Sequence, residues 1–217
     1  MRIGVLGSGL MGGKLGTIFA RAGHEVVFSY SRHRKKLDQL ARDAGGNARA
    51  GTPAEAVRDA DALLLAVHWN RTDDVLRQAG DLSGKVLVTC SLPMSDDDSE
   101  LVVAHTSSGA EELARKAAGS RVVAAFGTVP SEVLFAVFEA RDPGARPSLL
   151  CCGDDEDAKQ VARVLIQDVG FDPVDAGSLR MARYIEPFTM VVAQLAYERD
   201  EDPELTYRFE RLGSLSA

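Results

Sequence analysis

The feature that most constrains this chain is a glycine-rich turn at its N-terminus. An apolar run over residues 2–6 leads directly into this turn, and apolar residues at helical spacing follow it. The turn has the sequence Gly7-Ser8-Gly9-Leu10-Met11-Gly12. A strand, a Gly-x-Gly-x-x-Gly turn and a helix form the fingerprint of a dinucleotide-binding fold, because the glycines permit a tight turn and close approach of a pyrophosphate. The free N–H groups and the positive dipole end of the helix then attract the phosphates.

The end of the second predicted strand, over residues 24–30, indicates which dinucleotide binds. An NAD-binding protein would place Asp or Glu here to hold the ribose 2′-hydroxyl. This chain instead has Ser31-Arg32-His33-Arg34-Lys35-Lys36, and no carboxylate occurs before Asp38. Arg and Lys bind phosphate, Arg as a planar fork and Lys as a point charge. We therefore predict NADP(H) rather than NAD, against the alternative that the run is the solvated first turn of a surface helix.

The composition narrows the classes of partner that this chain is expected to bind. With 217 residues and a net charge of −7, the protein is acidic, which argues against nucleic acid or an anionic membrane as a partner. The basic cluster is therefore a local exception. No apolar run reaches the roughly 18 residues of a membrane span, and we predict a cytoplasmic protein. Cys90, Cys151 and Cys152 lack Cys-x-x-Cys spacing and are predicted to be buried thiols, with no metal site.

The order of predicted elements indicates the fold class. Apolar, strand-like runs alternate with helical segments, which predicts an α/β fold with a Rossmann-type doubly wound parallel sheet. The predicted strands are residues 2–6, 24–30, 47–50, 61–67, 86–90 and 122–126, followed by 149–152 and 171–175.

The later part of the chain is predicted to form a small C-terminal α+β extension. We place a boundary at Asp142-Pro143-Gly144, with an NADP-binding domain over 1–142 and a small domain over 143–217 that completes an acceptor cleft. The segment 178–197 is amphipathic and suits either the core or a homodimer interface. Pro187 is expected to kink this helix or displace its start.

Several further motifs carry a resemblance to a known family. In the middle of the chain these are Val67-His68-Trp69 and Thr128-Val129-Pro130; the late ones are Cys152-Gly153-Asp154-Asp155-Glu156, Asp175-Ala176-Gly177-Ser178-Leu179, and Arg183 with Glu186. Together with the glycine turn, Ser31-Arg32 and Lys36, they resemble the NADPH-dependent coenzyme F-420 (8-hydroxy-5-deazaflavin) reductase family. That family is related to the N-terminal oxidoreductase domain of ferric reductases. The resemblance covers nearly the whole chain.

The resemblance implies roles for individual residues. Ser8 to Met11 would hold the pyrophosphate, and Ser31, Arg32 and Lys36 the 2′-phosphate. Val67, His68, Ser131 and Leu205 would lie near the nicotinamide and the acceptor pocket. In an open α/β sheet, the cleft beyond the carboxyl ends of the strands is independently the expected ligand site.

The chain departs from the family pattern in the acceptor pocket. It has His68-Trp69 where relatives often have Pro-Trp, and Gly127 where they often have His. His24 and His33 are expected in surface elements and His105 in a polar loop, so His68 is the one candidate catalytic histidine. It would hydrogen-bond the nicotinamide or acceptor, or it would only fill the loop. Trp69 would pave the pocket or serve as a buried anchor.

Three functions are compatible with these features. The first is hydride transfer between NADP(H) and a small-molecule redox acceptor, a deazaflavin such as coenzyme F-420 or a flavin; here the cofactors carry the chemistry and the protein sets their distance. The second is NADPH-dependent reduction of a small carbonyl or imine. The third is a non-catalytic NADP-binding sensor.

Overall fold

The computed structural model describes residues 1–140, 146–198 and 202–211. Its framework is an eight-stranded sheet with the order β3-β2-β1-β4-β5-β6-β7-β8. The strands are β1 (Arg2–Leu6), β2 (Glu25–Ser29), β3 (Ala48–Ala50), β4 (Ala62–Leu65), β5 (Val86–Thr89), β6 (Arg121–Ala125), β7 (Ser148–Gly153) and β8 (Asp172–Asp175). This is the predicted Rossmann-type sheet with a C-terminal extension.

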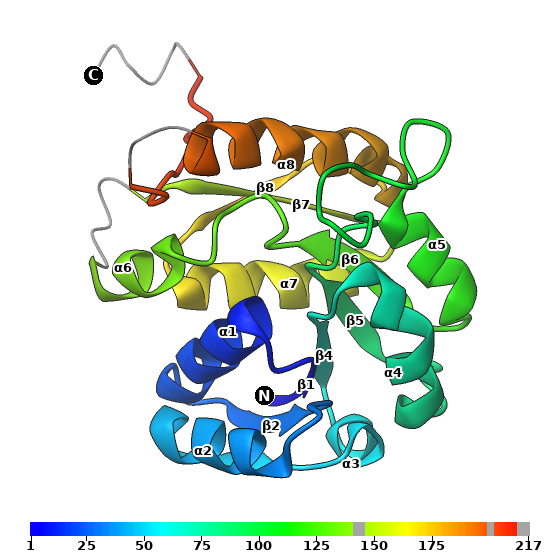
Figure 1. Cartoon of the computed structure of the whole chain (residues 1–217), viewed down its shortest axis with the longest axis vertical. Coiled ribbons are helices and arrows are strands. Elements are labelled where there is room, and N and C mark those ends of the chain that lie inside the picture. The colour runs from blue at the N-terminus through cyan, green and yellow to red at the C-terminus, as the bar shows by residue number, and fades with distance from the viewer. Residues whose placement is uncertain (141–145, 199–201, 212–217) are drawn as a thin grey trace.

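Helices cover both faces of the sheet (Figure 1). Buried side chains of α1, α2, α6 and α7 pack on one face, and those of α3, α4 and α5 pack on the other. The bounds are α1 (Leu10–Arg21), α2 (Arg34–Ala44), α3 (Pro53–Arg58), α4 (Thr72–Ala79), α5 (Gly109–Lys116), α6 (Val133–Ala140), α7 (Glu156–Val169) and α8 (Ala182–Tyr197), with short 3-10 helices η1 (Trp69–Arg71) and η2 (Leu179–Met181). The sequence did not predict α4 or α6.

The central strands are buried on both faces, as their continuous apolar runs predict. All four residues of β4 and all four of β5 are buried. Helix starts also follow the sequence: Thr52 and Glu55 form a reciprocal capping box at α3, and the Ser108 hydroxyl accepts from the Glu111 N–H at α5. These caps fix the entry points of the helices that surround the cleft edge of the sheet.

The C-terminal part extends the sheet, with one change of direction. β7 pairs antiparallel with β6, while β8 pairs parallel with β7. β7 therefore begins at the edge of the sheet at which β6 ends. The boundary predicted at residues 142–144 lies within 141–145, outside the described residues, and the division into two domains stays a prediction.

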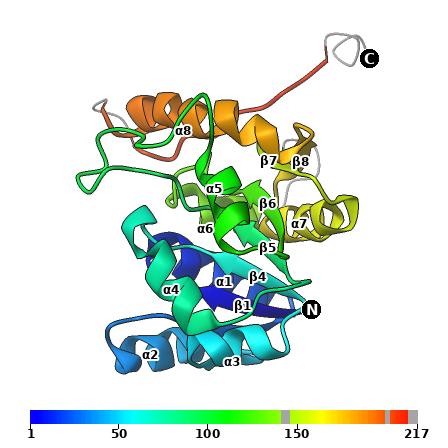
Figure 2. The ribbon, with the colours of Figure 1, turned by 90° about the vertical axis from the view of Figure 1, so that its right-hand side faces the viewer.

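Helix α8 lies at the end of the molecule opposite α2 and α3, as both ribbon views show (Figures 1 and 2). It begins at Ala182, four residues after the predicted start at Ser178, and continues through Pro187. Within the described residues, no helix combines the length and apolarity that a membrane crossing requires.

One expectation for the histidines was wrong. His24 is buried, not on the surface, and its Nε2 lies 2.8 Å from Asp168 Oδ2 of α7. It ties the turn after α1 to α7 and takes no part in the cleft. Cys151 and Cys152 are buried as predicted, and burial raises the pKa of the Cys152 thiol to about 12.

Candidate active site

The glycine turn lies at the carboxyl end of β1, next to β4, where strand order reverses direction. Gly7 has φ of 117°, and a Cβ there would collide with the Ala66 carbonyl oxygen. A Cβ on Gly12 would collide with the Gly7 carbonyl oxygen, so this glycine allows α1 to pack against the turn. The switch point of a doubly wound sheet is where dinucleotides bind. Both glycines are therefore required by the turn itself.

Gly9 differs, because the space beside it is empty. A Cβ on Gly9 would meet no atom within 4 Å, and Leu10 beside it is 73% exposed. Gly9 caps α1 without a side-chain hydrogen bond. The first N–H groups of α1 thus face open space, in an arrangement that suits a phosphate. The Ser8 hydroxyl donates to the Ser29 carbonyl oxygen at 2.7 Å, so the side chain points away from the turn. The backbone N–H of Ser8 is then the group of this residue that can bind a ligand.

A cavity of about 650 Å³ lies beyond the end of β2, in the place expected for the adenosine half of a dinucleotide. We call it the adenosine cavity. Its walls come from the segment after β2, the start of α3, η1 and α4. Its lining residues are Tyr30, Ser31, Arg32, Arg34, Leu37, Gly51, Thr52, Pro53, Arg71, Asp74 and Gln78.

Two arginines in this cavity are available to an anion. Within the described residues, neither Arg32 nor Arg71 makes a side-chain hydrogen bond or ion pair to another residue, whereas Arg34 pairs with Asp38 at 3.3 Å. Free guanidinium groups facing a cavity are suited to phosphate. The sequence predicted Arg32 but missed Arg71, which no local charge cluster marks. Lys36 is exposed on α2 and does not line the cavity.

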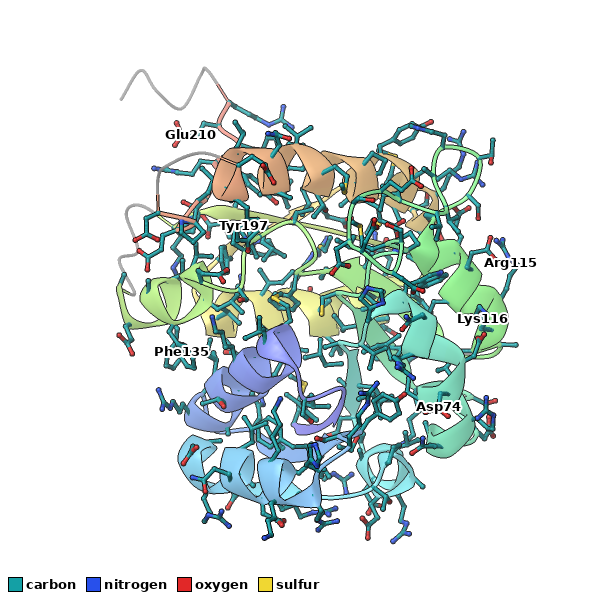
Figure 3. The ribbon with its side chains drawn as sticks, viewed as in Figure 1. Asp74, Arg115, Lys116, Phe135, Tyr197 and Glu210 are labelled. Carbon is teal, nitrogen blue, oxygen red and sulfur yellow. The ribbon has the colours of Figure 1, made fainter. Side chains whose placement is uncertain are left out.

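Tyr30 closes the same cavity from one side. Its hydroxyl donates to Asp74 Oδ2 on α4 at 2.8 Å; Asp74 is labelled in Figure 3. Burial raises the pKa of Tyr30 to about 12, and the bond to Asp74 adds to this shift. Tyr30 has φ of 58°, in the left-handed region that non-glycine residues rarely adopt. The Tyr30 phenol and the Asp74 carboxylate, whose pKa this hydrogen bond lowers, thus form a fixed wall beside the arginines.

A second cavity, of about 500 Å³, lies between the glycine turn, the loops after β5 and β6, and α8. We call it the acceptor cleft. Leu10 and Met11 line it and join it to the start of α1. The full lining is Leu10, Met11, Cys90, Leu92, Asp98, Phe126, Gly127, Val129, Pro130, Ser131, Glu132, Thr189, Val192, Ala193 and Tyr197. Burial raises the pKa of the Cys90 thiol to about 12, so it is a protonated wall residue.

Hydrogen bonds fix one rim of the acceptor cleft. Lys14 Nζ of α1 donates to the Ser131 carbonyl oxygen at 2.9 Å and to its Oγ at 3.2 Å. The Tyr197 hydroxyl, at the end of α8 (Figure 3), donates to Glu132 Oε2 at 2.9 Å. Phe126, which follows β6, has φ of 66°. The loop after β6 is thus held between α1 and α8.

Two of the remaining predicted residues, Val67 and His68, lie beside the cleft. Val67 follows β4, directly behind Gly7, and its N–H donates to Ser91 Oγ at 3.2 Å. His68 Nε2 lies 2.9 Å from Oδ1 of Asp98, which lines the cleft, while its Nδ1 is buried with no partner among the described residues. Trp69 and Leu205 are half-buried and line neither cavity.

Comparison with known proteins shows what the first part of the chain is similar to. Residues 2–93 match the model of the family described as NADP oxidoreductase, coenzyme F420-dependent. These residues are similar to that family. The matched residues contain the glycine turn, the lining of the adenosine cavity and one wall of the acceptor cleft, whereas the other wall comes from the loop after β6 and from α8.

Two relatives and one solved structure show how far the similarity extends. The chain is 28% identical over 211 residues to the F420-dependent NADP reductase of Methanocaldococcus jannaschii, covering 90% of this chain and 92% of that protein. It is 30% identical over 185 residues to Metalloreductase STEAP3 of Rattus norvegicus, covering 85% of this chain but only 36% of that protein. The structure of a candidate F420-dependent NADP reductase from Arthrobacter sp. FB24 matches with a TM-score of 0.83 at 24% identity, over 97% of this chain and 100% of that one.

Proposed function

We propose that this protein transfers a hydride between NADP(H) and a deazaflavin or flavin-like acceptor. The observation that carries the proposal is the continuity of the acceptor cleft with the start of α1 through Leu10 and Met11. A dinucleotide bound with its pyrophosphate at Gly9 and its adenosine near Arg32 would direct its nicotinamide into that cleft. Coenzyme F-420 enters the proposal through the family description and the archaeal relative.

The cleft suits hydride transfer between two rings. Its lining is largely apolar and includes Met11, Leu92 and Val192, which would exclude water from stacked rings. Such a reaction needs distance and orientation more than acid–base groups, since the cofactors carry the electrons. Val67, His68 and Ser131 would lie near the nicotinamide, and His68 would act through Asp98.

The C-terminal part would complete this site. Residues 143–217 contribute α8, whose Thr189, Val192 and Tyr197 line the cleft. The proposed homodimer would also use α8, which exposes Tyr184, Val191 and Leu195 on its outer face. Light scattering of the purified protein tests the dimer, and a monomer would remove it.

Rapid mixing of the protein with NADPH and each candidate acceptor tests the proposed activity. We expect the nicotinamide absorbance to fall when coenzyme F-420 or a free flavin is present, with reduction of the acceptor at the same rate. Oxidation of NADPH only by a small ketone or cyclic imine would favour the second function. Tight binding of NADPH without turnover of any acceptor would contradict the proposal and favour a sensor.

A further inference from the structure

The walls of the acceptor cleft carry negative charge and no positive charge. Its charged lining residues are Asp98, from the loop after β5, and Glu132, from the loop after β6. Within the described part of the chain, no Lys, Arg or His lines this cleft. The adenosine cavity is the opposite case, since three arginines line it. The two halves of the site therefore suit ligands of different charge.

Glu132 is ionised at the rim of the cleft. Its Oε2 accepts from the Tyr197 hydroxyl at 2.9 Å and from Ser131 Oγ at 3.2 Å. Burial alone would raise the pKa of Glu132, but these hydrogen bonds and the nearby charge of Lys14 hold the pKa below its ordinary value. Lys14 balances this one carboxylate, and two of its three N–H donors are already used on Ser131.

The charge that Lys14 does not balance lies on the loop after β5. Residues 95–100 contain no Lys or Arg, and their carboxylates are all exposed. Two contacts fix this loop beside the cleft: His68 Nε2 lies 2.9 Å from Asp98 Oδ1, and Asn70 Nδ2 donates to Asp96 Oδ1 at 2.7 Å. Among the described residues, the other oxygen of Asp98 has no hydrogen-bond partner. The acidic residues of the loop are Asp96, Asp97, Asp98 and Glu100.

The end of α8 adds to the same negative potential. This helix ends at Tyr197, which lines the cleft, and its last turn holds no basic residue. The C-terminal end of a helix carries roughly half a negative charge. The positive end of α1, at Leu10 and Met11, would be covered by the pyrophosphate of the nucleotide. With NADPH bound, the cleft would therefore repel a second anion.

We propose that the acceptor cleft selects a flavin or deazaflavin ring without an anionic side chain, with Asp98 and Glu132 as the residues that determine this specificity. The inference rests on the proposed function and names the charge class of its acceptor. Two stacked rings would occupy the cleft, so the side chain of the acceptor would extend past the rim that these carboxylates form. A phosphate on that side chain would be disfavoured by repulsion between like charges.

Two matched pairs of acceptors test the selection. Riboflavin and FMN share one ring and differ by a phosphate, which carries roughly two negative charges at neutral pH. Coenzyme F-420 pairs in the same way with the deazaflavin nucleoside that lacks its phosphate-bearing side chain. With saturating NADPH at about 0.01 M ionic strength, we expect kcat/KM to be at least about fivefold higher for the uncharged member of each pair. The difference should lie mainly in KM, because the reacting ring is the same.

Ionic strength separates the effect of charge from that of size. The Debye length falls from about 30 Å at 0.01 M to about 3 Å at 1 M salt, so the preference should nearly vanish in high salt. A preference caused by the bulk of the phosphate would not change.

Two variants identify the groups that repel the phosphate. D98N should lower the preference at least about twofold at low salt, and comparing the two members of a pair cancels any effect on the hydride step they share. E132Q should act in the same direction, since it leaves Lys14 unbalanced while the amide oxygen can still accept from Tyr197. D43N is the matched control: it removes an exposed carboxylate from α2, at the end of the molecule opposite α8 (Figures 1 and 2), and should keep the wild-type preference.

Three results would count against these proposals. Equal kcat/KM within each pair, or faster reaction of the phosphorylated member, would overturn the inference and leave the proposed function in place. A preference that persists in high salt and in D98N would also overturn it, because size and not charge would then be the cause. Absence of hydride transfer to all four acceptors would instead overturn the proposed function.

Discussion

Replacing Gly9 with alanine is expected to weaken NADPH binding by roughly 10- to 100-fold, or about 1–3 kcal/mol, while the fold remains intact. The Cβ would enter space that is empty in the free protein but would be filled by a bound pyrophosphate. The backbone of Gly9, with φ of −77° and ψ of −156°, is accessible to alanine. The weaker binding and the intact fold both follow from the empty space beside Gly9.

Titration calorimetry with NADPH and NADH, together with a thermal melt, checks the Gly9 variant. Both nucleotides should lose affinity by the same factor, because they share the pyrophosphate. Gly13→Ala is the matched control: its Cβ would lie 3.4 Å from a Leu40 methyl group, on the side of α1 facing α2, and it should bind normally. Unchanged affinity in Gly9→Ala would show that no phosphate approaches this turn.

Replacing Arg32 with alanine is expected to weaken NADPH binding by roughly 1–3 kcal/mol, the scale of a lost charged hydrogen bond, and to leave NADH almost unaffected. The guanidinium lines the adenosine cavity and is not paired within the described part of the chain. Arg71→Ala should act in the same direction, since this side chain lines the same cavity from η1.

Arg42→Ala controls for the general loss of a positive charge. Arg42 lies in the last turn of α2, where it donates to Gln39 Oε1 at 2.6 Å, away from the cavity. Its affinity for NADPH should match the wild type. If Arg32→Ala lowered the affinities for NADPH and NADH equally, the 2′-phosphate would not lie at this position.

The elements that the sequence predicted best are those with a local physical cause. The turn at Gly7 needs a positive φ, β4 and β5 are apolar throughout because both faces are covered, and Ser108 marks the start of α5 through its own hydrogen bond. Each of these signals lies within a few neighbouring residues. Patterns of that kind can be recognised before any tertiary contact is known.

The parts that the sequence did not predict depend on contacts between distant segments. Helix α6 is apolar around most of its circumference, so it shows no helical period. An apolar strand such as β7 has the same local pattern in either direction. Arg71 joins the adenosine cavity only because η1 follows β4, which pairs with β1, and β1 in turn pairs with β2. Glu186 meets the first N–H groups of α5 only when α8 packs against α5.

The central claim is that the glycine turn and the adenosine cavity together bind NADP(H) in preference to NAD(H). Titration calorimetry of the wild-type protein with NADPH and with NADH tests it most directly. The arrangement of Gly9, Arg32 and Arg71 predicts one site, with NADPH bound at least about tenfold more tightly, since one lost charged contact costs roughly that factor. Equal affinities, or no heat with either nucleotide, would contradict it.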